Sequence, residues 1–112
     1  MEKENYFPYK PKRKIVVFGQ REAWFKGIKD CLIDVEIVCD KNSSKNYENL
    51  IKKSDVVWIH RKMSHSLFGK INKTAKKLNK PILYFRGLGG ENCAKQIYNF
   101  EEKGEYISCL RN

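Results

Sequence analysis

The sequence predicts a single α/β domain whose parallel four-stranded sheet is covered by helices on both faces. Two observations support this prediction. Short apolar runs alternate along the chain with segments of helical spacing, and the connections between them are short. The 112 residues are also enough for one modest hydrophobic core. Strands that alternate with helices pair in parallel through right-handed crossovers, so we expect the strand order 2-1-3-4 in a three-layer Rossmann-like sandwich.

Four apolar runs supply the predicted strands, at residues 14–19, 35–40, 55–60 and 81–86. Segments with helical spacing follow them, and they predict helices at residues 22–32, 47–53, 64–79 and 91–103. Residues 87–90 predict a turn, and residues 106–110 predict a short fifth strand or a packed tail.

The first 13 residues are polar and contain Pro8 and Pro11, which predicts an arm ahead of a single domain at residues 14–112. We expect the arm to be extended or loosely docked. Its aromatic residues would stack on nucleic-acid bases, or dock on the domain itself or on a second subunit. They are Tyr6, Phe7 and Tyr9.

Composition excludes some classes of protein. No run of about 18 apolar residues exists, which excludes a membrane span, and the residues after Met1 lack the apolar core of a signal peptide. We therefore expect a cytoplasmic protein without a membrane partner. The four cysteines form no CxxC pair and lie in apolar segments, so we expect buried reduced thiols. They are Cys31, Cys39, Cys93 and Cys109.

The chain has a net charge of +10, and its positive charge is concentrated in one segment. Between Val56 and Gly90 there are eight Lys and Arg residues and no Asp or Glu, which leaves a net charge of +2 for the rest. On the helix at 64–79, five lysines share the arc opposite to the apolar one: Lys70, Lys73, Lys76, Lys77 and Lys80. This arc is either a solvated outer face or a surface that binds a polyanion, and the missing acidic residues argue for the second. The basic residues Lys10, Lys12, Arg13 and Lys14 would extend it.

Polar residues follow the predicted strands, where ligands bind in open parallel sheets. The strand order reverses beside the first and third strands, so the loops after them are the expected site. The candidate ligand-binding residues are Gln20, Arg21, Asp40, His60, Arg61, Lys62, Ser64, His65 and Arg86. Their basic groups, together with free N–H groups at a helix N-terminus, suit a phosphate or a carboxylate.

Each of these motifs also has a simpler explanation. Ser64 is a good N-cap for the helix that follows it, and the glycines at 87–90 suit a tight turn. Gly19 supplies only the first glycine of a dinucleotide-binding fingerprint. Neither His60 nor His65 has an acidic partner nearby in the sequence, so no catalytic or metal site is predicted. We therefore expect no enzymatic activity and no cofactor.

The chain resembles the bacterial domain-of-unknown-function family 2325 over about residues 14–100. The resemblance is carried by Lys14 to Gly19 before a helix with Trp24, by Ser54 to Ile59, by Met63-Ser64-His65 at the start of a basic helix, and by Lys80 to Arg86. It implies a small Rossmann-like fold without an assigned activity, with Ser64 and His65 as the signature pair. It also implies a regulator or accessory protein, including one carried on mobile elements. The Gly-Leu-Gly-Gly turn at 87–90 departs from the serine-containing stretch of the family, which puts a shared contact in doubt at this loop.

These observations support one expected function and two alternatives. The first is a non-enzymatic binding or regulatory module for a phosphate-bearing, nucleotide-like ligand at the carboxyl ends of the strands. The second is a nucleic-acid-binding protein that uses the lysine face. The third is an inhibitor or interaction protein whose basic face docks on an acidic or nucleic-acid-binding partner. A homodimer is also expected as a way to cover the edges of so small a sheet.

Overall fold

A computed structural model describes residues 6–19, 22–39, 46–60, 63–87 and 89–106. Within these residues the chain forms a parallel four-stranded sheet in the order β2-β1-β3-β4, which confirms the α/β prediction. The strands are β1 (Ile15–Gly19), β2 (Glu36–Cys39), β3 (Val56–Ile59) and β4 (Ile82–Tyr84). The helices are α1 (Glu22–Lys29), α2 (Tyr47–Lys53), α3 (His65–Lys77) and α4 (Gly90–Lys103).

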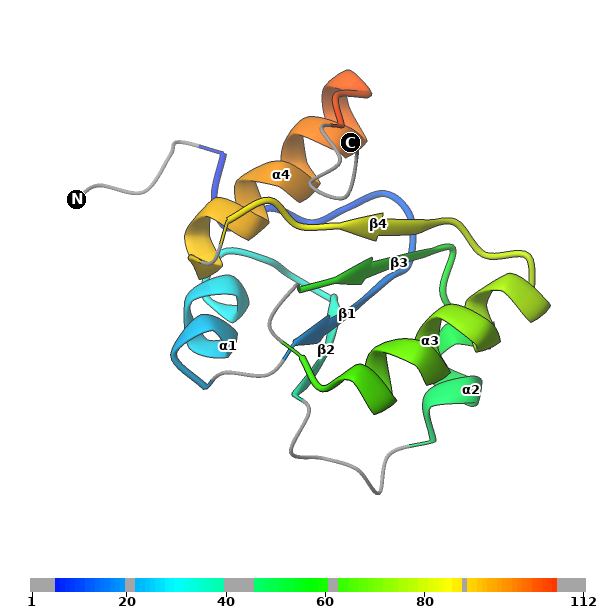
Figure 1. The fold of residues 1–112 in the computed structure, drawn as a ribbon. Coiled ribbons are helices and arrows are strands. Elements are labelled where there is room, and N and C mark those ends of the chain that lie inside the picture. The colour runs from blue at the N-terminus through cyan, green and yellow to red at the C-terminus, as the bar shows by residue number, and fades with distance from the viewer. Residues whose placement is uncertain (1–5, 20–21, 40–45, 61–62, 88, 107–112) are drawn as a thin grey trace.

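Helices cover both faces of the sheet, α1 and α4 on one and α2 and α3 on the other (Figure 1). Alternate strand residues face the two layers. On β1, Ile15 and Val17 pack toward α1 and α4, whereas Val16 and Phe18 pack toward α2 and α3. The central strands β1 and β3 are buried along their whole length, as parallel strands covered on both faces must be.

An aromatic cluster lies between the sheet and the α1–α4 layer. Trp58, on the central strand β3, is fully buried and stacks on Phe85 with 4.8 Å between ring centroids. Phe100 and Tyr106 meet the Trp58 ring edge-on, each at 5.9 Å. This aromatic cluster ties the central strand to α4 and to the segment that follows it.

The α1–α4 layer depends on a close helix crossing at Gly90, the first residue of α4. A Cβ atom at this position would lie 2.5 Å from the Trp24 carbonyl oxygen and 2.6 Å from the Ile28 nitrogen. Both are backbone atoms of α1, so no side-chain rotation relieves the clash. The glycine that sequence analysis assigns to a turn therefore allows two helices to touch.

The observed element boundaries differ from the predicted ones at several places, and tertiary hydrogen bonds accompany two of these differences. The helix expected to reach Leu32 ends at Lys29, since the backbone of the next residues pairs with the arm: Tyr9 N–H donates to the Cys31 carbonyl, and Ile33 N–H donates to the Tyr9 carbonyl. The last strand ends at Tyr84 rather than at Arg86, although Phe85 N–H still donates to the Ile59 carbonyl at 3.0 Å.

The helix α3 ends in a Schellman motif two residues before the predicted end. Asn79 adopts a left-handed φ of 57°. The N–H groups of Asn79 and Lys80 donate to the carbonyls of Lys76 and Ala75 at 3.1 and 2.8 Å. The predicted fifth strand lies mostly outside the described residues; of it, Tyr106 is described and is not in a strand.

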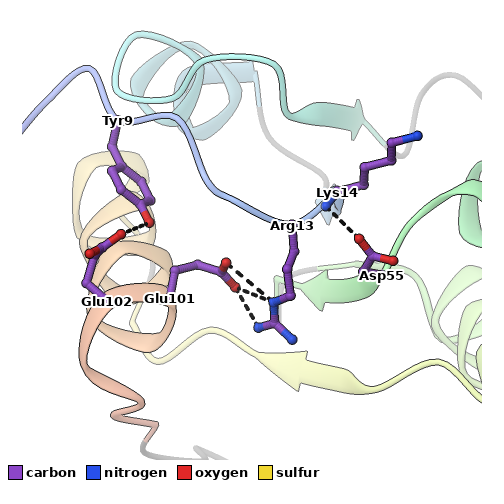
Figure 2. Close-up of polar contacts among 6 residues, drawn as sticks. All are labelled: Tyr9, Arg13, Lys14, Asp55, Glu101 and Glu102. Atoms are coloured by element: carbon purple, nitrogen blue, oxygen red, sulfur yellow. Dashed lines mark hydrogen bonds and ion pairs between the residues drawn. The ribbon is translucent and has the colours of Figure 1, made fainter.

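The described part of the arm packs against α1 and α4. Tyr6 stacks on Tyr98 with 3.7 Å between ring centroids. The Tyr9 hydroxyl donates to the Glu102 carboxylate at 2.6 Å, and burial together with this carboxylate holds the pKa of Tyr9 above its usual value. Arg13 pairs with Glu101 at 2.6 Å (Figure 2), where the Glu101 side chain is only 2% exposed. The start of β1 is tied to β3 by Lys14 N–H, which donates to the Asp55 carboxylate at 2.9 Å.

We expect Gly90→Ala to destabilise the protein by about 2 kcal/mol or more, because the added methyl group overpacks a backbone contact. Gly69→Ala is the control. It lies on the exposed side of α3 with open space around it, so it should stabilise the protein by about 0.5–1 kcal/mol. Chemical denaturation of both variants measures the two changes. Similar changes in the two variants would contradict the close crossing.

We expect Arg13→Gln to destabilise the protein by about 2 kcal/mol, because it leaves the nearly buried Glu101 carboxylate without its charged partner. Lys10→Gln breaks an ion pair with Asp34 in which both side chains are about two-thirds exposed, so it should cost less than about 0.5 kcal/mol. Thermal unfolding of the two variants at one pH checks the difference. Equal losses would show that the Arg13–Glu101 pair stabilises the protein no more than an exposed ion pair does.

Candidate functional site

The structure describes four of the nine residues predicted to bind a ligand at the strand ends. They are His60, Ser64, His65 and Arg86. They follow β3 and β4, which are neighbouring parallel strands, so they all lie toward one end of the sheet. Gln20, Arg21, Asp40, Arg61 and Lys62 lie outside the described residues.

His60 lies in the interior of the protein. It is 1% exposed, and its ring lies beside that of Trp24, with 5.0 Å between centroids. Its backbone N–H donates to the Phe18 carbonyl at 2.8 Å, which continues the β1–β3 ladder by one residue. His60 is therefore part of the buried core, whereas the other described candidates, Ser64, His65 and Arg86, are exposed.

Ser64 and His65 are exposed at the start of α3. The Ser64 hydroxyl accepts a hydrogen bond from Leu67 N–H at 3.3 Å, so Ser64 is the N-cap of α3. His65 occupies the first helical position, where the helix dipole favours anions. Both side chains are accessible from solvent at this end of the sheet.

The glycines near the strand ends have packing roles. A Cβ atom on Gly19 would overlap the Trp24 ring, which packs across the end of β1. Gly87 has a φ of 84°, a conformation that favours glycine in the turn after β4. Together with the helix crossing at Gly90, these contacts explain the glycines without a bound phosphate.

Arg86 follows β4, and side chains of α4 hold its backbone. The Gln96 carboxamide accepts a hydrogen bond from Arg86 N–H at 2.8 Å and donates one to the Arg86 carbonyl at 2.5 Å. Asn92 donates a second hydrogen bond to the same carbonyl at 3.1 Å. The Gln96 carboxamide thus pairs with Arg86 as the peptide group of a neighbouring strand would. The Arg86 guanidinium is left exposed on a fixed backbone.

A cavity of about 440 Å³ lies beside Arg86, between β3, α4 and the segment after α4. This volume is in the range of roughly 300–1,000 Å³ that is typical of small-molecule sites. Its walls combine aromatic rings, carboxamides, one cation and one carboxylate: Trp58, Tyr106, Asn92, Gln96, Asn99, Arg86 and Glu105. The Tyr106 hydroxyl accepts a hydrogen bond from Tyr84 N–H at 2.9 Å, which fixes this wall against β4.

Trp58 lines this cavity and also carries an unsatisfied polar group. Its indole nitrogen is buried and has no hydrogen-bond acceptor among the residues that the structure describes. In contrast, the indole of Trp24 donates to the Cys93 sulfur at 3.3 Å. A buried donor without a partner costs about 1–3 kcal/mol, so it marks a place where an acceptor is expected.

The lysine face of α3 forms a second candidate site, defined from here on as Lys70, Lys73, Lys76 and Lys77. These side chains are exposed, and Leu67, Ile71 and Ala75 are buried on the other side of the helix. In the described part of the chain, no carboxylate pairs with any of the four lysines. Lys80 departs from the prediction: it lies beyond the end of α3 and is half-buried, since its backbone completes the Schellman motif.

Two of the four cysteines, Cys31 and Cys93, are buried and are not in a disulfide bond, as the sequence predicts. Burial raises the pKa of the Cys93 thiol to about 12, although the hydrogen bond from Trp24 opposes this shift. Among the described residues, no group of three His, Cys, Asp or Glu side chains is placed to hold a metal ion. None of the described helices has the length and apolar character needed to cross a bilayer.

Two curated proteins match part of the chain, at 40% identity over 58 residues. Both are named UPF0751 protein and come from Desulfitobacterium hafniense, one from strain DSM 10664 / DCB-2 and one from strain Y51. The chain is similar to UPF0751 proteins. The match covers 51% of this chain and 57% of each relative, so the chain spans a little over half the length of the curated relatives it matches. No protein-family model and no solved structure matches the chain. The similarity supports the expectation of an uncharacterised family.

Most residues of the cavity are not among those predicted from the sequence. Asn92, Gln96 and Asn99 recur at positions i, i+4 and i+7 of α4, which places three carboxamides on one face of the helix. This spacing is a signal that the sequence contains. The contribution of Trp58 and Tyr106 to the cavity has no such signal in the sequence, because only the fold brings these residues beside α4.

Proposed function

We propose that the protein binds nucleic acid through the lysine face of α3. The observation that carries this proposal is a row of four exposed lysines with no carboxylate partner in the described residues. Ordinary surface helices mix both signs of charge, and α3 contains no acidic residue. Lysines without partners keep their full charge available for phosphate groups.

The geometry of α3 suits a phosphate backbone. Lys70 and Lys77 lie seven residues apart, which is about 10 Å along a helix axis. Lysine side chains are flexible point charges that follow phosphates without reading bases. The proposal is therefore binding without sequence specificity, driven by counterion release.

We expect duplex DNA binding to weaken steeply with salt, since each neutralised phosphate contributes a slope of about −0.9 to the plot of log K against log salt concentration. Four contacts give a slope of about −3 to −4. The triple variant Lys70→Gln, Lys73→Gln, Lys77→Gln should reduce the slope by about 2 to 3. Fluorescence anisotropy at several salt concentrations measures it.

The matched control removes the same charge elsewhere, at Lys26, Lys29 and Lys103, which are exposed and lie outside α3. This triple Gln variant should keep the slope of the unmodified protein to within about 1. Equal effects of the two triple variants would contradict an α3 interface. No DNA or RNA binding at low salt would contradict the proposal and leave an acidic protein as the partner of this face.

A second candidate function is favoured by the position of Arg86. This is the binding of a phosphate-bearing, nucleotide-like small molecule at the carboxyl ends of the strands. Arg86 has an exposed guanidinium on a backbone held by Gln96 and Asn92, and it lines the cavity. Ser64 and His65 supply exposed hydrogen-bonding groups at the same end of the sheet. Guanidinium groups bind phosphate in a bidentate manner.

We expect ribose 5-phosphate to bind the protein, with an affinity that Arg86→Gln lowers by about tenfold or more. Lys77→Gln removes the same charge from an exposed position on α3 and should leave the affinity unchanged. Isothermal titration calorimetry of the three proteins measures both effects. Equal affinities in all three would remove Arg86 from the phosphate site.

Family membership, location and the absence of enzymatic activity also remain proposals. Met63-Ser64-His65 at the start of a basic helix favours membership of the domain-of-unknown-function family 2325. We infer a cytoplasmic regulatory or accessory role without enzymatic activity, because the described site combines binding groups without a pair of catalytic residues.

A further inference from the structure

The cavity beside Arg86 contains polar groups that the fold itself does not use. Both polar atoms of the Gln96 carboxamide are engaged with the Arg86 backbone, and the Asn92 nitrogen bonds the same carbonyl. The Asn99 carboxamide has no hydrogen bond to any residue that the structure describes. Two of the three carboxamides are therefore engaged with the Arg86 backbone, and Asn99 is available to a ligand.

Trp58 has a second polar group that the fold does not use. It borders the cavity, it is fully buried, and its indole nitrogen lacks an acceptor among the described residues. Phe85 and Phe100 enclose the ring on other sides. The nitrogen is shielded from solvent, so a molecule in the cavity supplies the missing acceptor once the side chains that cover the nitrogen shift.

These groups specify the chemistry of the occupant. Asn99 offers one acceptor and two donors in one plane, which is the pattern that pairs with the edge of a nucleobase. The Trp58 indole requires an acceptor, which every base provides on its edge, and Tyr106 offers an aromatic wall for a flat ring. Arg86 at the same cavity suits a phosphate group joined to that ring.

We propose that the cavity between β3, α4 and Tyr106 is a nucleobase-binding subsite that seats the base of a nucleoside 5′-monophosphate whose phosphate lies on Arg86. Asn99 and the Trp58 indole read the base. The assignment rests on the second candidate function above, the phosphate site at Arg86, and adds a specific class of ligand to it. It does not depend on the lysine face.

Calorimetric titration compares the four common nucleoside 5′-monophosphates with ribose 5-phosphate. We expect at least one nucleotide to bind about tenfold or more tightly than ribose 5-phosphate, because only the nucleotide fills the cavity. Arg86→Gln should weaken both classes of compound. Asn99→Leu should weaken the preferred nucleotide by about tenfold and leave ribose 5-phosphate unchanged.

Two further variants separate recognition from folding. Trp58→Phe keeps an aromatic ring and removes the indole N–H, so it should weaken the nucleotide while leaving ribose 5-phosphate unchanged. Asn49→Leu makes the same change of asparagine to leucine on the exposed side of α2, so it should change neither affinity. Thermal unfolding confirms that each variant is folded at the temperature of the titration, and a Trp58→Phe variant that unfolds leaves Asn99→Leu as the decisive one.

The titrations distinguish failure of the base subsite from failure of the phosphate site. If ribose 5-phosphate binds as tightly as every nucleotide, the base subsite is wrong and the phosphate site stands. The same conclusion follows if nucleotides bind more tightly but Asn99→Leu leaves their affinity unchanged. If no phosphate compound binds, the phosphate site and the base subsite are both wrong.

Discussion

The contact between α1 and α4 at Gly90 is the constraint on which the candidate cavity depends. Because Gly90 has no side chain, α4 approaches the backbone of α1 and lies low on the sheet. At that distance Cys93 accepts the hydrogen bond of Trp24, and one turn later Gln96 reaches the backbone of Arg86. A helix held farther from the sheet would leave Arg86 without its support and the cavity without one wall. The packing of α4 on α1 at Gly90 thus fixes the hydrogen bonds between Gln96 and the Arg86 backbone.

The two proposed sites lie on opposite helical layers and use different physical chemistry. On α3 the binding groups are charges that remain in water, so their contribution is long-ranged and sensitive to salt. Beside α4 the binding groups are partly enclosed hydrogen-bonding groups around aromatic rings, where shape and pairing decide affinity. One sheet separates the two, since α3 packs through Leu67 and Ile71 while α4 packs through Cys93 and Ile97. Each site can therefore change without disturbing the packing of the other.

The fold was largely predictable because its signals are local. Apolar runs, Ser64 as an N-cap and the stop at Lys80-Pro81 all act within a few residues, and strand order follows from connection rules. The errors come from contacts between distant segments. Tyr9 pairs with Cys31 and Ile33 and thereby ends α1 early. The exposed part of the lysine face followed from helical spacing, but the cavity required knowing that Trp58 and Tyr106 meet beside α4.

The hydrogen bonds from Gln96 have a consequence for assembly. An edge strand with free N–H and carbonyl groups is a template on which another chain can pair. At β4 the next positions are already taken, since Tyr106 occupies Tyr84 N–H and Gln96 occupies both backbone groups of Arg86. A second copy would have to displace these side chains before it could extend the sheet there. Gln96 and Tyr106 therefore block the pairing of another chain at this edge, and loss of Gln96 would expose the backbone groups of Arg86 to such pairing.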